Sequence, residues 1–206
     1  MRKMGVVAAC ILGLVVLVLA AFGVQNARIN VEAVCQIERL GGGQGSGTLV
    51  ASNSHEALIL TCRHVAAKVG ERVTITWLAT GQQCEGTVLD VVTDTPGLES
   101  DLAFIRSAIP SRITPVSIGT FDPKNGPFTT VGYRDRELYI SIARTASEFE
   151  GRIRLSAPLM FGMSGGPCFD RYGHLVGVGV ATSLTEGVAA NGKYLKELVD
   201  KYKWAN

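Results

Sequence analysis

The 206 residues of this chain are enough for one mid-sized domain, or for two small lobes that share one core. Lys and Arg number 20 and Asp and Glu number 18, so the formal charge of +2 produces no strong field, and a partner made of nucleic acid is disfavoured. The apolar content of 47%, together with 24 Gly and 7 Pro, excludes a disordered tail, a coiled coil and a collagen-like chain. We therefore expect a globular, loop-rich protein.

The first two dozen residues indicate membrane targeting, because Arg2 and Lys3 precede an unbroken apolar run over residues 4–24. The apolar part of a secretory signal spans about 7–15 residues whereas a membrane helix needs about 20, so the run favours an uncleaved hydrophobic helix over residues 1–24. A cleaved signal peptide is the alternative, since Ala20 and Gly23 are small residues at plausible cleavage positions. In both cases residues 25–206 are expected outside the cytoplasm, either anchored to the membrane or secreted.

Cysteine usage leaves two alternatives open. One cysteine lies in the apolar run and four lie beyond it, and four cysteines in an exported domain allow three disulfide pairings that sequence cannot distinguish. Buried free thiols are the other alternative, because a body of this size can hold a core without disulfides. The cysteines are Cys10, Cys35, Cys62, Cys84 and Cys168.

Alternation of apolar and polar residues with period two dominates the rest of the chain, which predicts β-strands. The alternation is clearest over residues 31–38, 72–77 and 152–157. Shorter apolar runs, separated by Gly, Pro and Asn, occupy residues 57–61, 87–92, 101–106, 128–133, 137–143 and 174–181. About a dozen strands at spacings of about 8–12 residues indicate a sandwich or barrel, not alternating strands and helices. The end differs, since Tyr194, Leu198 and Tyr202 recur on one face of a helix predicted from Lys193.

Three short segments carry residue types that suit nucleophilic catalysis. His64 ends a predicted strand, Asp101 opens another, and Ser164 lies among glycines in a loop between two strands. A serine hydroxyl is a weak nucleophile at neutral pH, so it needs a base and a third group that aims the base. Each residue alone also has a structural explanation in a tight turn or a strand end. Cys62 and His64 offer neither the number nor the spacing of zinc ligands, so no metal and no cofactor is expected.

In the order His, Asp, Ser, these segments resemble the trypsin-like serine peptidases, and most nearly the short bacterial domains of the HtrA (Deg) kind. The similar stretches are residues 45–50 (Gly-Ser-Gly-Thr-Leu-Val), 59–65 (Ile-Leu-Thr-Cys-Arg-His-Val), 101–103 (Asp-Leu-Ala), 163–167 (Met-Ser-Gly-Gly-Pro) and 176–180 (Val-Gly-Val-Gly-Val). The likeness covers about residues 31–199. It implies an all-β fold of two six-stranded antiparallel β-barrels, with the active site between them and a C-terminal helix on the outside.

The resemblance also implies the roles of the site residues. Ser164 would be the nucleophile, His64 the general base and then acid, and Asp101 the group that fixes the histidine tautomer. The backbone N–H groups of Gly162 and Ser164 would form the oxyanion hole. The substrates would be proteins or peptides.

Two departures from the family limit what the resemblance implies. Digestive trypsins place an acidic residue before the serine and use it after zymogen cleavage, but Met163 stands here, so activation by a new N-terminus is not implied. The chain ends at Asn206, so we expect no PDZ module and no substrate capture by one.

Substrate preference is predicted from the residues that would line the pocket before the scissile bond. None of them is charged, which suits small or medium apolar side chains and offers no counter-ion for Arg or Lys. The predicted lining residues are Pro158, Leu159, Met160, Val178 and Val180.

Two other hypotheses follow from the same residues. Residues 162–166 satisfy the G-x-S-x-G pattern of α/β-hydrolases, with Asp170 and His174 following in the matching order. That motif needs a strand-to-helix turn, which residues 165–167 (Gly-Gly-Pro) do not suit, and the spacings are too short for partners on separate strands. The second hypothesis is a non-catalytic, membrane-anchored binding domain that keeps the peptidase fold, since a fold does not guarantee activity.

Overall fold

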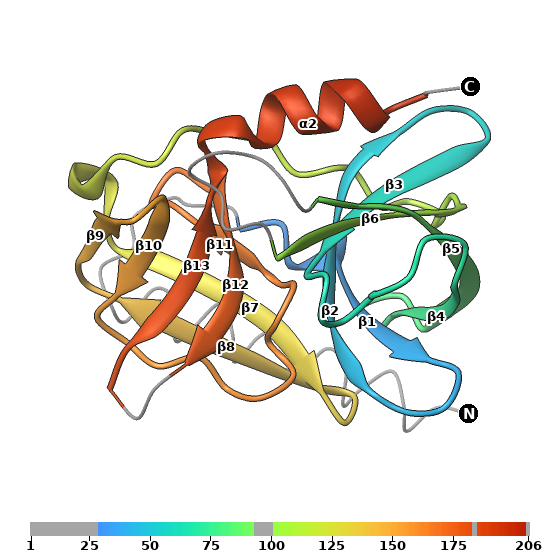
Figure 1. Ribbon diagram of the computed structural model, residues 1–206, viewed down its shortest axis with the longest axis horizontal. Helices are drawn as coiled ribbons and strands as arrows, with labels where there is room; N and C mark the ends of the chain where they lie inside the picture. Colours follow the sequence, from blue (N-terminus) through green and yellow to red (C-terminus); the bar gives the residue numbers. More distant parts are fainter. Residues whose placement is uncertain (1–28, 93–100, 183–184, 205–206) are drawn as a thin grey trace.

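The computed structural model describes residues 29–92, 101–182 and 185–204, which form two β-sheets beside each other with one helix across their shared side (Figure 1). The first sheet is a closed six-stranded barrel with strand order β1-β2-β3-β6-β5-β4, and every pairing in it is antiparallel. Its strands are β1 (Val34–Arg39), β2 (Gln44–Ser52), β3 (Glu56–Thr61), β4 (Arg72–Trp77), β5 (Gln82–Val92) and β6 (Leu102–Ala108).

The second sheet has seven strands in the order β8-β7-β11-β12-β13-β10-β9, so the prediction of a second closed six-stranded barrel is wrong in this form. The reason is a break at Arg144 and Thr145, which divides one stretch of extended chain into two strands. The first half pairs with β7 and the second with β10, so the two edge strands are consecutive in the chain. The strands are β7 (Phe128–Arg134), β8 (Glu137–Ala143), β9 (Ala146–Phe149), β10 (Arg152–Leu155), β11 (Pro167–Phe169), β12 (Leu175–Thr182) and β13 (Gly187–Asn191).

One hydrophobic core joins the two sheets. Trp77 and Phe104 from the barrel belong to the same buried cluster as Phe169 and Val178 from the second sheet. A smaller cluster in the second sheet includes the fully buried Met163. Because burial of apolar area is the main driving force of folding, this shared cluster holds the sheets at a fixed distance and lets residues from both meet at one site.

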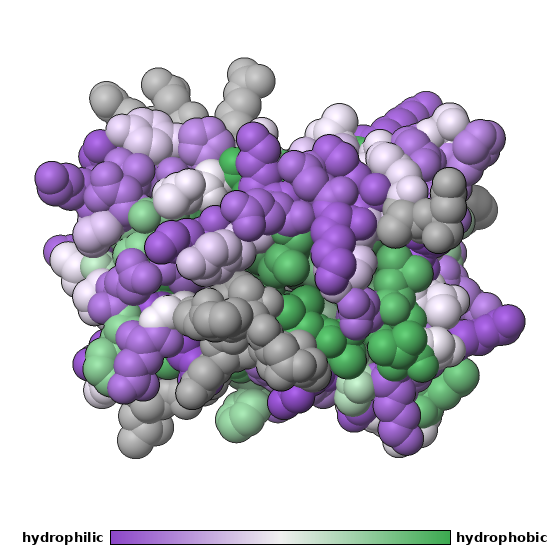
Figure 2. Space-filling model, turned by 45° about the horizontal axis from the view of Figure 1, so that its top comes forward, coloured by the Kyte–Doolittle hydropathy of each residue, from purple (hydrophilic) through white to green (hydrophobic). Residues whose placement is uncertain are grey.

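The predicted C-terminal helix is confirmed. A 3-10 turn over Gly192–Tyr194 leads into α2 (Leu195–Tyr202), whose Leu195 and Val199 are buried. Tyr202 packs its ring against Phe104 of β6 at 4.6 Å between centroids, and its hydroxyl donates to Asp90 of β5. The polar face of α2 lies toward solvent, and the view in Figure 2, which brings this side forward, is mostly hydrophilic with hydrophobic residues gathered near its centre. Two short 3-10 turns, Val31–Ala33 and Pro123–Asn125, complete the assigned elements.

The predicted membrane anchor, residues 1–24, and the boundary at residue 25 lie outside the described residues. Among the helices that the structure describes, none has both the length and the apolar character that a membrane span requires.

All four cysteines of the described chain are free thiols, so none of the three disulfide pairings considered from the sequence forms, and the alternative of free thiols is the one observed. Cys35, Cys62 and Cys168 are buried, whereas Cys84 is partly exposed. Burial raises the pKa of Cys168 to about 12 and raises the pKa values of the Cys35 and Cys62 thiols as well.

Iodoacetamide added to the folded full-length chain should modify Cys84 and leave the buried Cys35, Cys62 and Cys168 unmodified. The thiolate is the reactive form, and the raised pKa values keep the buried thiols protonated even at pH 9. Peptide mapping by mass spectrometry, with urea-unfolded protein as the control, measures each site. Modification of Cys168 as fast as Cys84, or any disulfide-linked peptide, would contradict the packing described here.

Candidate functional site

The pairing of β3 with β6 brings His64 to Asp101. Thr61 of β3 lies opposite Ala103 of β6, so the residue just before β6 faces the turn that follows β3. That turn is tight, because the backbone N–H groups of Val65 and Ala66 both donate to the Cys62 carbonyl, at 3.0 and 3.1 Å. Two distant segments are thereby held together at one edge of the barrel.

Asp101 binds both the backbone and the ring of His64. Its Oδ1 accepts the His64 backbone N–H at 2.9 Å, and its Oδ2 accepts a hydrogen bond from the imidazole Nδ1. The Arg63 backbone N–H donates to the Asp101 carbonyl at 3.1 Å and fixes the backbone beneath the pair. The His64 side chain is 47% exposed and that of Asp101 is 21% exposed, so the ring reaches solvent while the carboxylate behind it is mostly covered. This arrangement leaves Nε2 as the ring nitrogen free to act as a base.

Cys62 lies beneath the pair, and its Sγ is within 4.8 Å of the ligand atoms of His64 and Asp101. A metal would need the thiolate, but the Cys62 thiol donates to the Gly179 carbonyl at 3.1 Å. Burial raises the pKa of this thiol well above its usual range, and the negative charge of Asp101 adds to the shift. The three residues are therefore poorly suited to hold a metal ion.

The predicted nucleophile Ser164 follows a tight turn between β10 and β11. The Met163 backbone N–H donates to the Met160 carbonyl at 3.1 Å and closes the turn, and Gly162 at its third position has φ +92°. A positive φ at this position is characteristic of a type II turn and favours glycine. Met163, which is fully buried, anchors the turn in the smaller hydrophobic cluster.

The Ser164 loop lies against the segment that carries His64. The Ser164 carbonyl accepts the Ser46 backbone N–H of β2 at 2.7 Å. A Cβ on the next residue, Gly165, would lie 2.2 Å from Thr61 Oγ1 and 3.1 Å from the backbone nitrogen of Cys62. The Ser164 hydroxyl itself donates to the Val180 carbonyl of β12 at 3.3 Å, so the structure holds the serine beside the histidine segment with its proton directed to the second sheet.

The five predicted pocket residues occupy different environments. Leu159 is buried over Gly179 and Gly187, where it would contact any added Cβ at 3.2 and 2.8 Å. Val178 is completely buried in the main cluster and so belongs to the core. Val180 is half-buried beside Ser164, whereas Pro158 and Met160 are exposed. Of the predicted pocket residues, Val180 therefore lies beside Ser164, whereas Val178 is buried in the core and cannot line a surface pocket.

The residues of the α/β-hydrolase hypothesis do not approach Ser164 in the required way. Ser164 is followed by strand β11 in place of a helix. Asp170 caps the β11–β12 turn, where its Oδ1 accepts the backbone N–H groups of Tyr172 and His174, both at 2.9 Å. The contact of 3.4 Å between His174 and Asp170 is therefore part of a turn.

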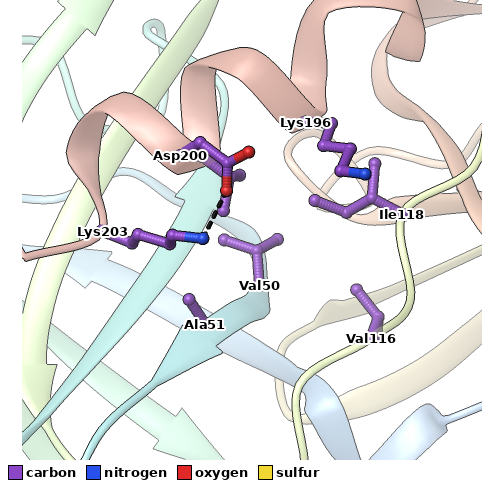
Figure 3. A pocket seen from close by; sticks show the side chains of 8 residues that line it. Val50, Ala51, Val116, Ile118, Lys196, Asp200 and Lys203 are labelled. Carbon is purple, nitrogen blue, oxygen red and sulfur yellow. Dashed lines mark hydrogen bonds and ion pairs between the residues drawn. The ribbon is translucent and has the colours of Figure 1, made fainter.

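Two surface cavities lie away from His64 and Ser164. One, of about 260 Å³, opens between α2 and β2, with Val50, Ala51, Val116 and Ile118 opposite Lys196, Asp200 and Lys203 (Figure 3). The other, of about 250 Å³, lies at the break between β8 and β9 and includes Thr145, Arg154 and Glu186.

The trypsin-like peptidase domain family matches residues 45–178 of this chain, which include His64, Asp101 and Ser164. The chain belongs to this family. It is therefore a serine endopeptidase of the trypsin-like class. A comparison with curated proteins gives no match.

Solved structures share the peptidase's fold at low sequence identity. The serine protease of a human pathogenic astrovirus is 23% identical with a TM-score of 0.61, over 80% of this chain and 91% of its own. The Rv3671c protease in an inactive form is 21% identical with a TM-score of 0.63, over 84% and 89%. A serine-to-alanine mutant of Rv3671c from M. tuberculosis H37Rv, also inactive, is 20% identical with a TM-score of 0.62, over 88% and 93%.

Sequence reasoning missed two groups at the peptidase site. One is the Val180 carbonyl, which accepts the Ser164 hydroxyl, and no side-chain pattern predicts a backbone acceptor. The other is Ser46, whose hydroxyl donates to the Gly162 carbonyl at 2.7 Å. Ser46 lies in the Gly-Ser-Gly stretch noted in the sequence, so the motif could be found from the sequence, whereas the contact of Ser46 with Gly162 could not.

Replacing Gly165 by Ala should destabilise the peptidase much more than replacing Gly70. Both have similar φ values, +86° and +81°, so the backbone strain is similar and costs about 1 kcal/mol. A Cβ at Gly165 would lie 2.1 Å from the Ser46 carbonyl oxygen, whereas a Cβ at Gly70 meets nothing within 4 Å. We expect Gly165→Ala to lower the free energy of unfolding by about 3 kcal/mol or more, measured by urea titration. Equal losses for the two variants would contradict the close approach.

Proposed function

We propose that this peptidase hydrolyses peptide bonds of extracytoplasmic proteins through an acyl-enzyme, with His64, Asp101 and Ser164 as its catalytic triad. The observation that carries the proposal is the exposed His64 ring held by the Asp101 carboxylate. The loop that carries Ser164 lies against the end of the strand that leads to His64, directly after a turn with glycine at its third position. These are the three roles that acyl transfer by a serine requires: a nucleophile, a base and a group that aims the base.

In the proposed acylation, Ser164 Oγ attacks the carbonyl carbon of the substrate and its proton passes to Nε2 of His64. The Nδ1–H of the ring stays bonded to Asp101, which stabilises the imidazolium without taking the proton. The hydroxyl first turns from the Val180 carbonyl toward the ring, a rotation about the Cα–Cβ bond of Ser164. His64 then returns the proton to the leaving amine as the C–N bond breaks.

Deacylation uses the same groups with water as the nucleophile. His64 takes a proton from water, the hydroxide adds to the acyl carbon, and the proton returns to Ser164 Oγ as the ester bond breaks. In both tetrahedral intermediates, the oxyanion accepts the backbone N–H groups of Gly162 and Ser164. One such donor contributes about 2.7–4 kcal/mol to stabilising the transition state.

The residue before the scissile bond is proposed to be small or medium and apolar. Exposed Met160 precedes the serine in the chain, half-buried Val180 accepts the Ser164 hydroxyl through its carbonyl, and neither side chain carries charge. Leu159 fills the space over Gly179 and Gly187, which limits the depth available to a substrate side chain. The extracytoplasmic location is proposed from Arg2, Lys3 and the apolar run over residues 4–24.

Labelling with a fluorophosphonate tests the proposal, because this probe reacts covalently with an activated serine. The detergent-solubilised full-length chain should be modified at Ser164, as mapped by mass spectrometry, and Ser164→Ala should remove the modification. His64→Ala should lower the labelling rate by about 10³-fold, since the base is lost.

The chain offers its own matched control, because His174 is also exposed and also lies beside an aspartate. His174→Ala should label at the rate of the unsubstituted chain. If the folded chain is not labelled, the proposed catalysis is wrong and a non-catalytic binding domain becomes the better interpretation. Equal rate losses for His64→Ala and His174→Ala would also overturn the assigned base.

A further inference from the structure

We propose that Ser46, on β2 of the barrel, is a positioning residue that fixes the oxyanion turn of the second sheet. The inference rests on the proposed function, since it assigns a purpose to contacts around the Gly162 and Ser164 N–H groups. Ser46 itself touches no reacting atom. It acts by holding the two peptide groups that lie next to these donors.

The Ser46 hydroxyl joins two segments of the second sheet. It donates to the Gly162 carbonyl at 2.7 Å and accepts the Tyr133 backbone N–H of β7 at 2.7 Å. Ser46 is completely buried, so water does not compete for either bond. The one Ser46 hydroxyl therefore acts both as a hydrogen-bond donor and as a hydrogen-bond acceptor.

The backbone of Ser46 holds the same loop at a second point. Its N–H donates to the Ser164 carbonyl at 2.7 Å, and its own carbonyl accepts the Thr61 hydroxyl at 2.7 Å. Thr61 is the last residue of β3, three residues before His64. Ser46 thus connects the oxyanion turn directly to the strand that carries the proposed base.

These bonds restrict the directions of the two donors. The Gly162 carbonyl and the Gly162 N–H are attached to the same Cα, as are the Ser164 carbonyl and the Ser164 N–H. When a carbonyl is held, its N–H can change direction only by rotation about φ and ψ of that one residue. Ser46 holds both carbonyls, so the two N–H groups can turn only through the φ and ψ rotations of Gly162 and Ser164, of which Gly162 has a positive φ.

Packing around Gly162 restricts the rotations of this residue. A Cβ on Gly162 would lie 2.8 Å from the Tyr133 carbonyl oxygen and 2.7 Å from Arg134 Cβ. The turn therefore lies directly on the end of β7, the same strand that donates to Ser46. Movement of β7 relative to β2 would therefore break the hydrogen bonds of the Ser46 hydroxyl and release the turn at the same time.

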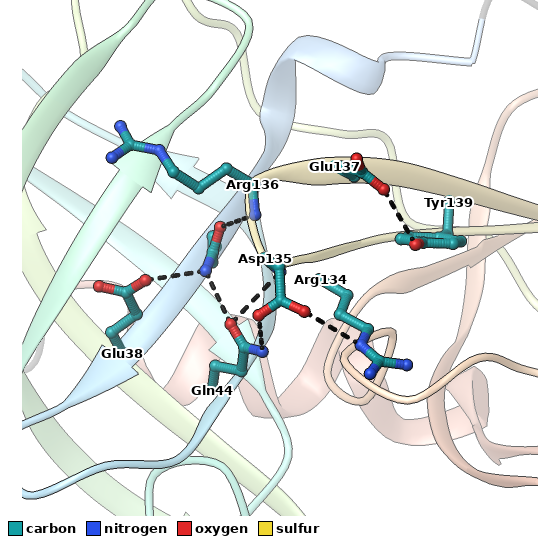
Figure 4. A network of polar contacts seen from close by, with 8 residues as sticks. Glu38, Gln44, Arg134, Asp135, Arg136, Glu137 and Tyr139 are labelled. Atoms are coloured by element: carbon teal, nitrogen blue, oxygen red, sulfur yellow. Dashed lines mark hydrogen bonds and ion pairs between the residues drawn. The ribbon is translucent and has the colours of Figure 1, made fainter.

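A polar network at the C-terminal end of β7, where the β7–β8 hairpin meets β1 and β2, keeps that strand in place (Figure 4). The β7–β8 hairpin turns at Asp135 and Arg136, which have φ values of +49° and +68°. Gln44 of β2 donates to Asp135 Oδ1 at 2.8 Å, and this bond lowers the pKa of Asp135. Buried Gln36 of β1 accepts the Arg136 backbone N–H at 3.1 Å. The hairpin is thus bound to the barrel close to Ser46, since Gln44 lies two residues before it on β2.

Removing the Ser46 hydroxyl leaves the Gly162 carbonyl and the Tyr133 N–H without their partner in a dry site. The turn can then satisfy its carbonyl only by rotating, which turns the Gly162 N–H away from the oxyanion. A misplacement of about 1 Å in a catalytic group can lower a rate by about 10²-fold. The expected defect is in the chemical step, because Ser46 is buried and does not contact substrate.

The test is the labelling of Ser164 by a fluorophosphonate in the full-length chain, with kinact and KI measured separately for Ser46→Ala and Thr48→Val. Thr48 is the matched control: it lies two residues along β2, is equally buried, and its hydroxyl has no hydrogen-bond partner among the described residues. Labelling is carried out below the unfolding midpoint of each variant. We expect Ser46→Ala to lower kinact by about 10²-fold with KI unchanged, and Thr48→Val to leave both unchanged.

Two results would overturn the inference while the unsubstituted chain is labelled normally: an unchanged kinact in folded Ser46→Ala, or an equal loss in Thr48→Val. Absence of labelling in the unsubstituted chain would instead overturn the proposed function. If Ser46→Ala does not fold, Ser46→Thr replaces it, because it keeps the hydroxyl. Folded Ser46→Thr should then label within about threefold of the unsubstituted rate, and a loss of about 10²-fold would contradict the assigned bond.

Discussion

The site depends on a backbone-to-backbone contact between the nucleophile loop and strands β2 and β3. Gly165 approaches the Ser46 carbonyl and Thr61 so closely that a Cβ would lie 2.1–2.2 Å from their oxygen atoms. No side chain larger than hydrogen fits there, and the direct bond from Ser46 N–H to the Ser164 carbonyl forms only because the chains come this close. The relative positions of the serine, the turn over residues 160–163 and the histidine segment all depend on this one contact.

The two sheets divide the work of the proposed catalysis. The closed barrel supplies His64 from the turn after β3 and Asp101 from the residue before β6, so their bond is set by the register of these adjacent strands. The second sheet supplies Ser164 from the loop between β10 and β11. That loop is held by hydrogen bonds to β12 on one side and to β2 on the other. One hydrophobic cluster spans both sheets. Its close packing holds the His64–Asp101 pair and Ser164 at fixed relative positions without a covalent link between the sheets.

Much of the barrel could be predicted from the sequence, because strands such as Arg72–Trp77 alternate with one face in the core. The short strands β9, β11 and β13 could not, since none of them alternates apolar and polar residues over its three to five positions. The break at Arg144 and Thr145, which replaces a second barrel by a seven-stranded sheet, carries no Gly or Pro signal. His64, Asp101 and Ser164 could be selected because their residue types fit one chemistry, but Ser46 acts through a buried hydroxyl that only the three-dimensional contacts reveal.

A crystal structure of the full-length chain after reaction with a fluorophosphonate tests the proposed site most directly. We expect phosphorus bonded to Ser164 Oγ and one phosphonyl oxygen at about 2.7–3.1 Å from the backbone nitrogens of both Gly162 and Ser164. The Ser46 hydroxyl should still donate to the Gly162 carbonyl, and the His64 ring should still be bonded to Asp101. A phosphonyl oxygen that faces solvent beyond reach of both nitrogens, or phosphorus on another residue, would show that the proposed nucleophile or oxyanion hole is wrong.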